Sequence, residues 1–304
     1  MSKAKYYFDF FYTKLLSEKT RHRADVIFIT ISIISFLLHL GFILLIDLNL
    51  IQLGDNSGLL KNPIAAIYTP FSFILIYEVY LLVYYLPKST TVYIAKQYEI
   101  ITLIIIRRIF KDLTNLKFNE DWFTAKENIL FGVDLLATLA LFYLIFVFYQ
   151  LNQTRQAAKK NEVERTSEKT RGVLRFVDFK KGLAMLLIPI FIVLSFYSLT
   201  HWIYESLTIV QMVGNIKDIN KIFFDEFFTI LILVEVLILL VSFFLDDDFS
   251  NIIRNSGFII STILIKLSFG TEGILNTFLI LIAVIFGVLV LFIHNKYKTL
   301  EVEI

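Results

Sequence analysis

The chain has 304 residues, a net charge of +2 and no cysteine, and 57% of its residues are hydrophobic. An average soluble domain has about 45–50% apolar and about 25% charged residues, whereas the charged fraction here is 18%. This composition excludes an ordinary water-soluble protein. The lack of cysteine excludes disulfides and thiolate chemistry, and the small net charge gives no indication of nucleic-acid binding.

The N-terminal part predicts a cytoplasmic leader followed by a first membrane span. Residues 1–24 carry six Lys/Arg and an aromatic-rich stretch that is typical of an interfacial amphipathic helix. Residues 26–46 contain His39 and no charge, so they are long and apolar enough to cross a bilayer. Their length favours a retained span over a cleaved signal peptide.

Two further helices are predicted around a tight turn at Pro87. The first, residues 64–86, carries Glu78 about eight residues from its inner end, which places the carboxyl group roughly 12 Å deep. In an antiparallel pair, Glu99 of the next helix lies at a similar depth. The two acids are then expected to share a proton, to bind a cation, or to need Lys96 nearby.

The second of these helices has a short apolar core, residues 100–106, bracketed by Lys96, Glu99, Arg107 and Arg108. Length alone would make it interfacial. Basic loops stay in the cytoplasm, however, so residues 1–24 and 151–182, the latter with nine Lys/Arg, should lie on one side. An even number of crossings must separate them. We therefore expect this helix to cross, enclosed by the others, although the basic 107–128 connection would then lie outside.

The second half repeats the first about 157 residues further along. "YEVYLLV" around Glu78 is echoed by "VEVLILL" around Glu235, and "IITLIIIR" ending at Arg107 by "IISTILIK" ending at Lys266. The predicted fold is therefore an all-α integral membrane protein with about eight transmembrane helices in two parallel four-helix repeats. The expected spans are residues 26–46, 64–86, a helix around 100–106, 129–149, 183–204, 222–245, 252–268 and 274–294.

The same pattern predicts the domain organisation. A cytoplasmic N-terminus (1–24) precedes the first repeat (25–150), a basic linker (151–182), the second repeat (183–295) and a cytoplasmic tail (296–304). The linker is expected to be a solvated helix or a flexible segment. Both termini should lie in the cytoplasm, and the membrane is expected to be a bacterial plasma membrane.

Charged residues within the predicted spans are the candidates for a functional site. Glu78 and Glu235, with Glu99, are candidate ion or proton sites, because buried carboxylates in membranes often mark such paths; alternatively they are structural groups, protonated or salt-bridged. Arg107, Arg108 and Lys266 are expected to snorkel to the outer interface. In a sharper alternative, Arg107 or Arg108 pairs with Asp134, and Arg254 faces the acidic residues 246–248.

Two histidines, His39 and His201, occupy comparable positions in the two halves. Paired histidines could ligate haem or relay protons. No helix carries a second ligand one turn away from either of them, so we expect both to be ordinary hydrogen-bonding groups. No cofactor or metal is predicted. Enzyme motifs such as HExxH or a phosphate-binding glycine loop are absent from the sequence, and we expect no enzyme.

The first four-helix unit resembles a voltage-sensor module. Its second helix has a mid-depth acid followed by "YLLVYYL", and its third is short and bears an acid. The fourth helix has no Arg or Lys, so the gating charges that the resemblance would imply are missing.

The sequence thus predicts an ion channel or ion-coupled transporter that uses the repeated glutamates. Its expected partners are the lipid bilayer and a cation or proton. The alternative is a scaffold or signalling subunit whose basic 151–182 loop binds anionic lipid or a cytosolic partner.

Overall fold

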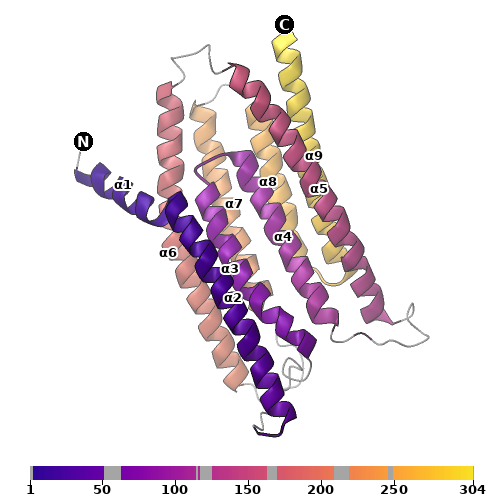
Figure 1. The fold of residues 1–304 in the computed structure, drawn as a ribbon. Helices are drawn as coiled ribbons and strands as arrows, with labels where there is room; N and C mark the ends of the chain where they lie inside the picture. Colours follow the sequence, from indigo (N-terminus) through magenta and orange to yellow (C-terminus); the bar gives the residue numbers. More distant parts are fainter. Residues whose placement is uncertain are drawn as a thin grey trace. The chain divides into compact units, whose positions relative to one another are not determined.

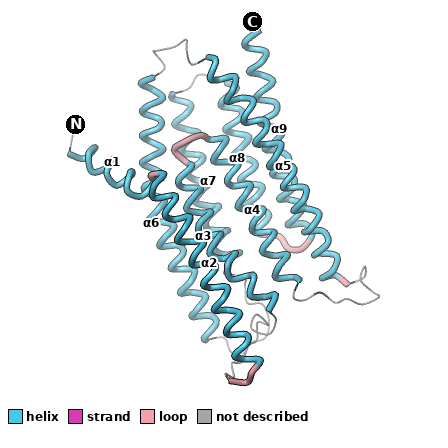
Figure 2. Tube along the Cα trace, viewed as in Figure 1, coloured by secondary structure: helices cyan, strands magenta, loops and turns pink. Residues whose placement is uncertain are grey.

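The computed structural model describes residues 3–50, 63–113, 116, 125–162, 170–208, 219–245 and 249–303. Within these ranges the protein is helical and contains no strand (Figures 1 and 2). The elements are α1 (Lys3–Leu16), α2 (Glu18–Asp47), the 3-10 helix η1 (Pro63–Ile67), α3 (Tyr68–Tyr85), α4 (Thr90–Leu113), α5 (Lys126–Glu162), α6 (Thr170–Thr208), α7 (Ile219–Leu245), α8 (Phe249–Phe269) and α9 (Ile274–Glu303).

Local sequence signals explain where several helices begin and end. Ser17 separates α1 from α2 and caps α2, since its side chain accepts a hydrogen bond from the Thr20 backbone N–H at 3.2 Å. Asn49, just after α2, has φ 55°, a left-handed conformation that Asn tolerates better than most residues. Gly273 has φ 65° and closes the short turn between α8 and α9, where glycine has no steric penalty.

Among the described residues, five helices are long and apolar enough to cross a membrane: Phe10–Asp47, Lys126–Gln153, Glu226–Phe244, Phe249–Phe269 and Ile274–Leu300. Their large apolar side chains are widely exposed, as at Leu136 (69%) and Phe244 (89%). Water would disfavour such surfaces, whereas lipid solvates them. Several long apolar helices of this kind indicate an integral, multi-pass membrane protein.

Three of the eight expected spans are not among these five. The apolar helix that carries Glu78 is shorter than expected: residues 63–67 form a 3-10 turn, and the apolar α-helical stretch is Thr69–Tyr85. The helix α4 is long but carries many charges. The expected span 183–204 lies in α6, where the side chains of residues 195–196 and 198–208 are outside the described set.

The expected linker 151–182 is largely helical. The helix α5 continues without a break to Glu162, and α6 begins at Thr170, so only residues 163–169 lie outside the described residues. Residues such as Gln, Ala, Lys and Glu at 156–162 are good helix formers, which explains why α5 extends beyond its apolar part.

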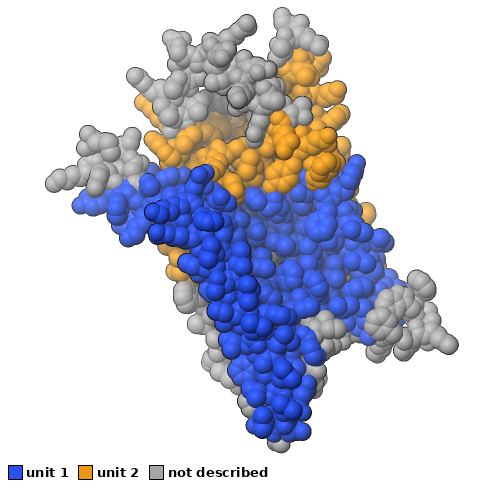
Figure 3. Space-filling view, viewed as in Figure 1, with its two compact units in different colours: residues 1–84, 95–145 blue, residues 85–94, 146–304 orange. Residues whose placement is uncertain are grey.

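The chain divides into two units (Figure 3). Unit 1 comprises Met1–Tyr84 and Ala95–Ile145, and unit 2 comprises Tyr85–Ile94 and Phe146–Ile304. One boundary between the units lies inside α5, between Ile145 and Phe146. The α3–α4 turn belongs to unit 2.

In unit 1, α2, α3, α4 and the first part of α5 alternate in direction (Figure 1). Aromatic contacts join consecutive helices: the rings of Phe28 and Tyr77 are 5.5 Å apart between α2 and α3, and those of Phe71 and Phe110 are 5.1 Å apart between α3 and α4. No described residue of α4 is exposed. The described charged side chains of α4 are therefore buried or partly buried.

In unit 2, each of α6, α7, α8 and α9 contacts the next in the chain, and they too alternate in direction. An aromatic cluster of Phe191, Phe227, Phe228 and Phe269 fills the space between α6, α7 and α8, with ring centroids 4.9 to 5.3 Å apart. The helices α8 and α9 approach closely at Gly257. The Ser261 hydroxyl donates a 2.7 Å hydrogen bond across the same pair to the Ala283 carbonyl.

Candidate functional site

Glu78 lies on α3, about two turns before the end of this helix. Its Oε2 atom is buried and has no hydrogen-bond partner among the described residues. The charged side chains that interact with it electrostatically are Lys96 and Glu99 on α4 and Asp25 on α2. The structure thus places Glu78, Glu99 and Lys96 together, as the predicted helix pair required, and adds Asp25, which the sequence analysis missed.

Lys96 and Glu99 form an ion pair one turn apart on α4, with Nζ and Oε2 2.5 Å from each other. Pairs at this spacing face each other on a helix surface. The Lys96 ammonium therefore neutralises Glu99 directly and also interacts electrostatically with Glu78.

Glu235 occupies the corresponding place in unit 2, about three turns before the end of α7, and only 6% of it is exposed. It lines a cavity of about 20 Å³, room for roughly one water molecule. Polar groups from three other helices line the same cavity: Thr90 and Tyr93 of α4, Lys180 of α6 and Asn255 of α8. Aliphatic side chains, including Ile238 and Leu239, form most of the rest of its wall.

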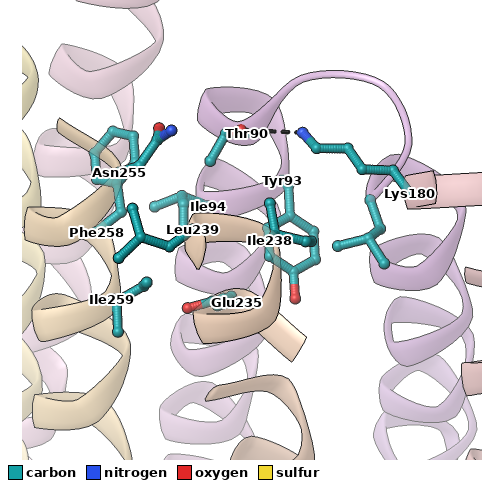
Figure 4. A pocket seen from close by; sticks show the side chains of 11 residues that line it. Thr90, Tyr93, Ile94, Lys180, Glu235, Ile238, Leu239, Asn255, Phe258 and Ile259 are labelled. Carbon is teal, nitrogen blue, oxygen red and sulfur yellow. Dashed lines mark hydrogen bonds between the residues drawn. The ribbon is translucent and has the colours of Figure 1, made fainter. Parts of the chain in front are cut away.

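The polar groups gather at the two ends of this cavity (Figure 4). Lys180 and Thr90 lie at one end, where the ammonium Nζ donates a 3.2 Å hydrogen bond to the Thr90 hydroxyl. The Tyr93 hydroxyl points toward the level of Glu235 at the other end (Figure 4). A buried acid and a buried base therefore share one small water-sized space.

Lys180 was not among the residues singled out from the sequence. It is 4% exposed, although it stands at the end of a basic stretch that reads as solvated. Burial, and then the positive charge of Arg254, lowers the pKa of Lys180 to about 8. The Phe176 ring, one turn earlier on α6, lies 4.7 Å from its ammonium and partly compensates for the lost hydration.

Arg254 and His294 form a second buried polar cluster in unit 2. The guanidinium donates to the side-chain oxygens of Asn251 and Asn255 at 2.8 to 3.3 Å, and its Nη1 lies 3.3 Å from Nε2 of His294. His294 Nδ1 faces Ser250, 2.8 Å from its hydroxyl. The sequence predicted acidic partners at 246–248 for Arg254, but these lie outside the described residues. The sequence placed His294 at the end of the expected span 274–294 and predicted no role for it.

Arg108 and Asp134 form a bidentate ion pair between α4 and α5 in unit 1, with Nε–Oδ2 and Nη2–Oδ1 distances of 2.5 and 2.6 Å. This is the pairing that the sequence offered as the alternative to snorkelling. Arg107 is only 5% exposed, so its guanidinium lies inside the protein. Lys266 is half-buried in the last turn of α8.

Of the two histidines predicted to lie within spans, the structure describes the side chain of His39. His39 Nδ1 lies 2.5 Å from the Thr69 hydroxyl of α3, a contact typical of a hydrogen-bonding histidine. The backbone of His201 is helical, but its side chain is outside the described set. Within the described residues, no three His, Cys, Asp or Glu side chains are arranged to hold a metal ion.

No protein-family model matches this chain, and no curated protein or solved structure is significantly similar to it. Functional conclusions therefore come from the two glutamate sites and their surroundings.

Proposed function

We propose that this protein moves ions across a membrane, as a channel or an ion-coupled transporter, and that Glu78 and Glu235 are its equivalent ion-handling groups. The observation that carries the proposal is the recurrence of a carboxylate with a buried oxygen on α3 of unit 1 and on α7 of unit 2. An ionised carboxylate in hydrocarbon costs several kcal/mol, so such groups are rare in membrane spans and mark ion or proton paths.

The surroundings of the two glutamates support this function. Glu78 interacts electrostatically with one cation, Lys96, and two anions, Asp25 and Glu99. This mixture of charges leaves Glu78 without a dedicated counter-ion. Glu235 lines a water-sized cavity. The buried Oε2 atom of Glu78 has no hydrogen-bond partner among the described residues, whereas Asp134 forms a bidentate ion pair with Arg108.

The proposal includes a topology with eight crossings in two parallel four-helix repeats. In it, α3, α4 and α6 cross in addition to the five helices that are long and apolar enough by themselves. The 24 residues of α4 span about 36 Å, more than the roughly 30 Å of hydrocarbon. Its charges are compatible with a crossing because none of its described residues is fully exposed and some of its charged side chains form ion pairs, as Lys96 does with Glu99 and Arg108 with Asp134. Both termini then lie in the cytoplasm, beneath a bacterial plasma membrane.

Single variants test whether the two sites are equivalent. We expect Glu78→Gln and Glu235→Gln each to lower ion flux into proteoliposomes, with unchanged amounts of protein in the membrane. Glu226→Gln is the matched control, because Glu226 is an exposed acid on the same helix as Glu235. The proposal would be contradicted if only Glu226→Gln lost ion flux, or if none of the three variants lost it.

The alternative function, a scaffold acting through the basic segment, is favoured by one observation: α5 continues as a charged helix to Glu162. Neutralising Lys159 and Lys160 to Gln keeps good helix formers in this extension. An ion-conducting protein should keep its flux. A scaffold would lose its binding to vesicles that contain anionic lipid or to its cytosolic partner.

A further inference from the structure

The size and the lining of the cavity beside Glu235 indicate which kind of ion the protein handles. All of its lining residues belong to unit 2, and they include one buried acid, Glu235, and one buried base, Lys180. Its volume of about 20 Å³ admits roughly one water molecule. Apart from the acid and the base, the polar lining consists of two hydroxyls and one amide, from Thr90, Tyr93 and Asn255.

Metal cations are poorly matched to this space. A hard cation needs about six oxygen ligands, from protein or from water that it carries along. The cavity has few oxygen-bearing side chains, and its remaining wall is largely aliphatic. The Lys180 ammonium in the same wall would repel any metal ion that entered, and this repulsion is much stronger in a low-dielectric interior than in water.

A proton does not need a shell of oxygen ligands. It needs one water or hydroxyl within hydrogen-bond reach of the next group, and Figure 4 shows the Tyr93 hydroxyl at the level of Glu235 and the Thr90 hydroxyl beside Lys180. A water molecule in the cavity can pass one of its protons to the Glu235 carboxylate as it accepts a proton from the next hydrogen-bonded group, which leaves a water molecule and a neutral acid and requires no free cation to occupy the cavity. Release of the proton to water on the other side restores the carboxylate, so that charge and atoms balance.

We infer that the ion handled at Glu235 is the proton, and that Lys180 is a positioning residue whose ammonium excludes metal cations from the cavity. This inference rests on the proposed function. It adds the chemical class of the ion and a selectivity role for a residue that is not itself the carrier.

Proteoliposomes that contain a pH-sensitive dye or a K⁺-sensitive dye test it directly. The wild type should pass protons and no K⁺ above the empty-vesicle level, and Glu235→Gln should lower the proton flux. Lys180→Gln should raise K⁺ flux to about ten times the empty-vesicle level, because the repulsion by the ammonium is lost. Lys180→Arg, which keeps the charge, should restore the wild-type ratio of K⁺ flux to proton flux.

Lys181→Gln is the matched control. Lys181 is the next residue along α6, pairs with Asp178 at the surface at 3.5 Å and is not part of the cavity lining. It should leave the ratio unchanged. A change in flux ratio that Lys181→Gln reproduces would reflect general loss of surface charge and would overturn the role of Lys180, as would an unchanged ratio in Lys180→Gln.

The outcomes separate this inference from the proposed function. Glu235-dependent flux carried by K⁺ in the wild type would overturn the proton assignment and leave the proposed function intact. Flux that is indifferent to both Glu78→Gln and Glu235→Gln would overturn the proposed function, and the assignment with it.

Discussion

The Nη1 atom of Arg254 lies 3.3 Å from Nε2 of His294. Arginine has donors only, so the histidine nitrogen must accept this hydrogen bond and the imidazole must be neutral, with its proton on Nδ1. Nδ1 in turn faces both the hydroxyl and the carbonyl oxygen of Ser250. One buried histidine thus links the start of α8 to the final part of α9 in a defined tautomer.

Removing His294 should therefore destabilise the contact between α8 and α9. His294→Leu deletes an acceptor of a buried guanidinium, a loss of about 1–3 kcal/mol. Arg254→Met should cost less in the His294→Leu background than in the wild type, giving a coupling energy of about 0.5–3 kcal/mol. Denaturant unfolding of the four proteins in detergent measures both quantities. Strictly additive effects would contradict the proposed link.

Gly257 marks the closest approach of the same two helices. A Cβ atom there would lie 2.7 Å from both methyl groups of Val290, whose β-branched side chain has little rotamer freedom in a helix. Gly257→Ala should therefore destabilise unit 2 by about 1–3 kcal/mol, measured by thermal unfolding.

Gly132→Ala is the control for this substitution. Nothing lies within 4 Å of a Cβ atom at Gly132, so the change should have the usual helix benefit of about 0.5–1 kcal/mol. Combining Gly257→Ala with Val290→Ala should recover part of the loss. Equal effects at Gly257 and Gly132 would rule out the close approach.

The buried Lys180 should make stability depend on pH. Its pKa is about 8 in the folded protein and about 10.5 ordinarily, because burial and Arg254 disfavour the ammonium form. Between these values the unfolded chain binds more protons, so the free energy of unfolding should rise with pH from about 8 to about 10.5. Below pH 8 both states are protonated, and this contribution should be flat.

Lys180→Met removes the titrating group and should abolish this rise, while Lys181→Met should not. The other charged or titratable groups around Lys180 are Glu235 on α7, Tyr93 on α4 and Arg254 on α8, and they are the same in both variants. Melting temperatures from pH 7 to 10 provide the test. A parallel pH profile for Lys180→Met and the wild type would show that Lys180 is not withdrawn from water.

The number of crossings can be counted by parity. The chain has no cysteine, so a single introduced cysteine is its only thiol. Exposed positions are Lys19, Glu272 and Thr299. Eight crossings predict that cysteines at 19 and 299 are labelled from the cytoplasmic side and one at 272 from outside. Five crossings predict that 19 and 272 share a side and that 299 lies on the other.

Much of the membrane character followed from hydropathy alone. Uncharged runs such as 26–46 and 274–294 fall within the helices α2 and α9. The closeness of Glu78, Glu99 and Lys96 followed from counting residues back and forward from the turn at Pro87, because helix geometry fixes the rise per residue.

What the sequence could not provide was the surroundings of single polar residues. Lys180 lies in a basic stretch, and its burial depends on side chains from α4, α7 and α8 that are far away in the sequence. His294 ends an apolar run, and its role depends on Ser250 and Arg254 of another helix. In a single sequence, long-range packing of this kind has no periodic pattern.

The most direct measurement is proton flux into liposomes that hold either the purified wild type or the Glu78→Gln/Glu235→Gln double variant, under an imposed pH gradient and membrane potential. The account predicts flux above empty liposomes for the wild type and flux at the empty-liposome level for the double variant, with both proteins folded and reconstituted in equal amounts. Equal flux in the two samples, or no flux from the wild type under any imposed gradient, would contradict it.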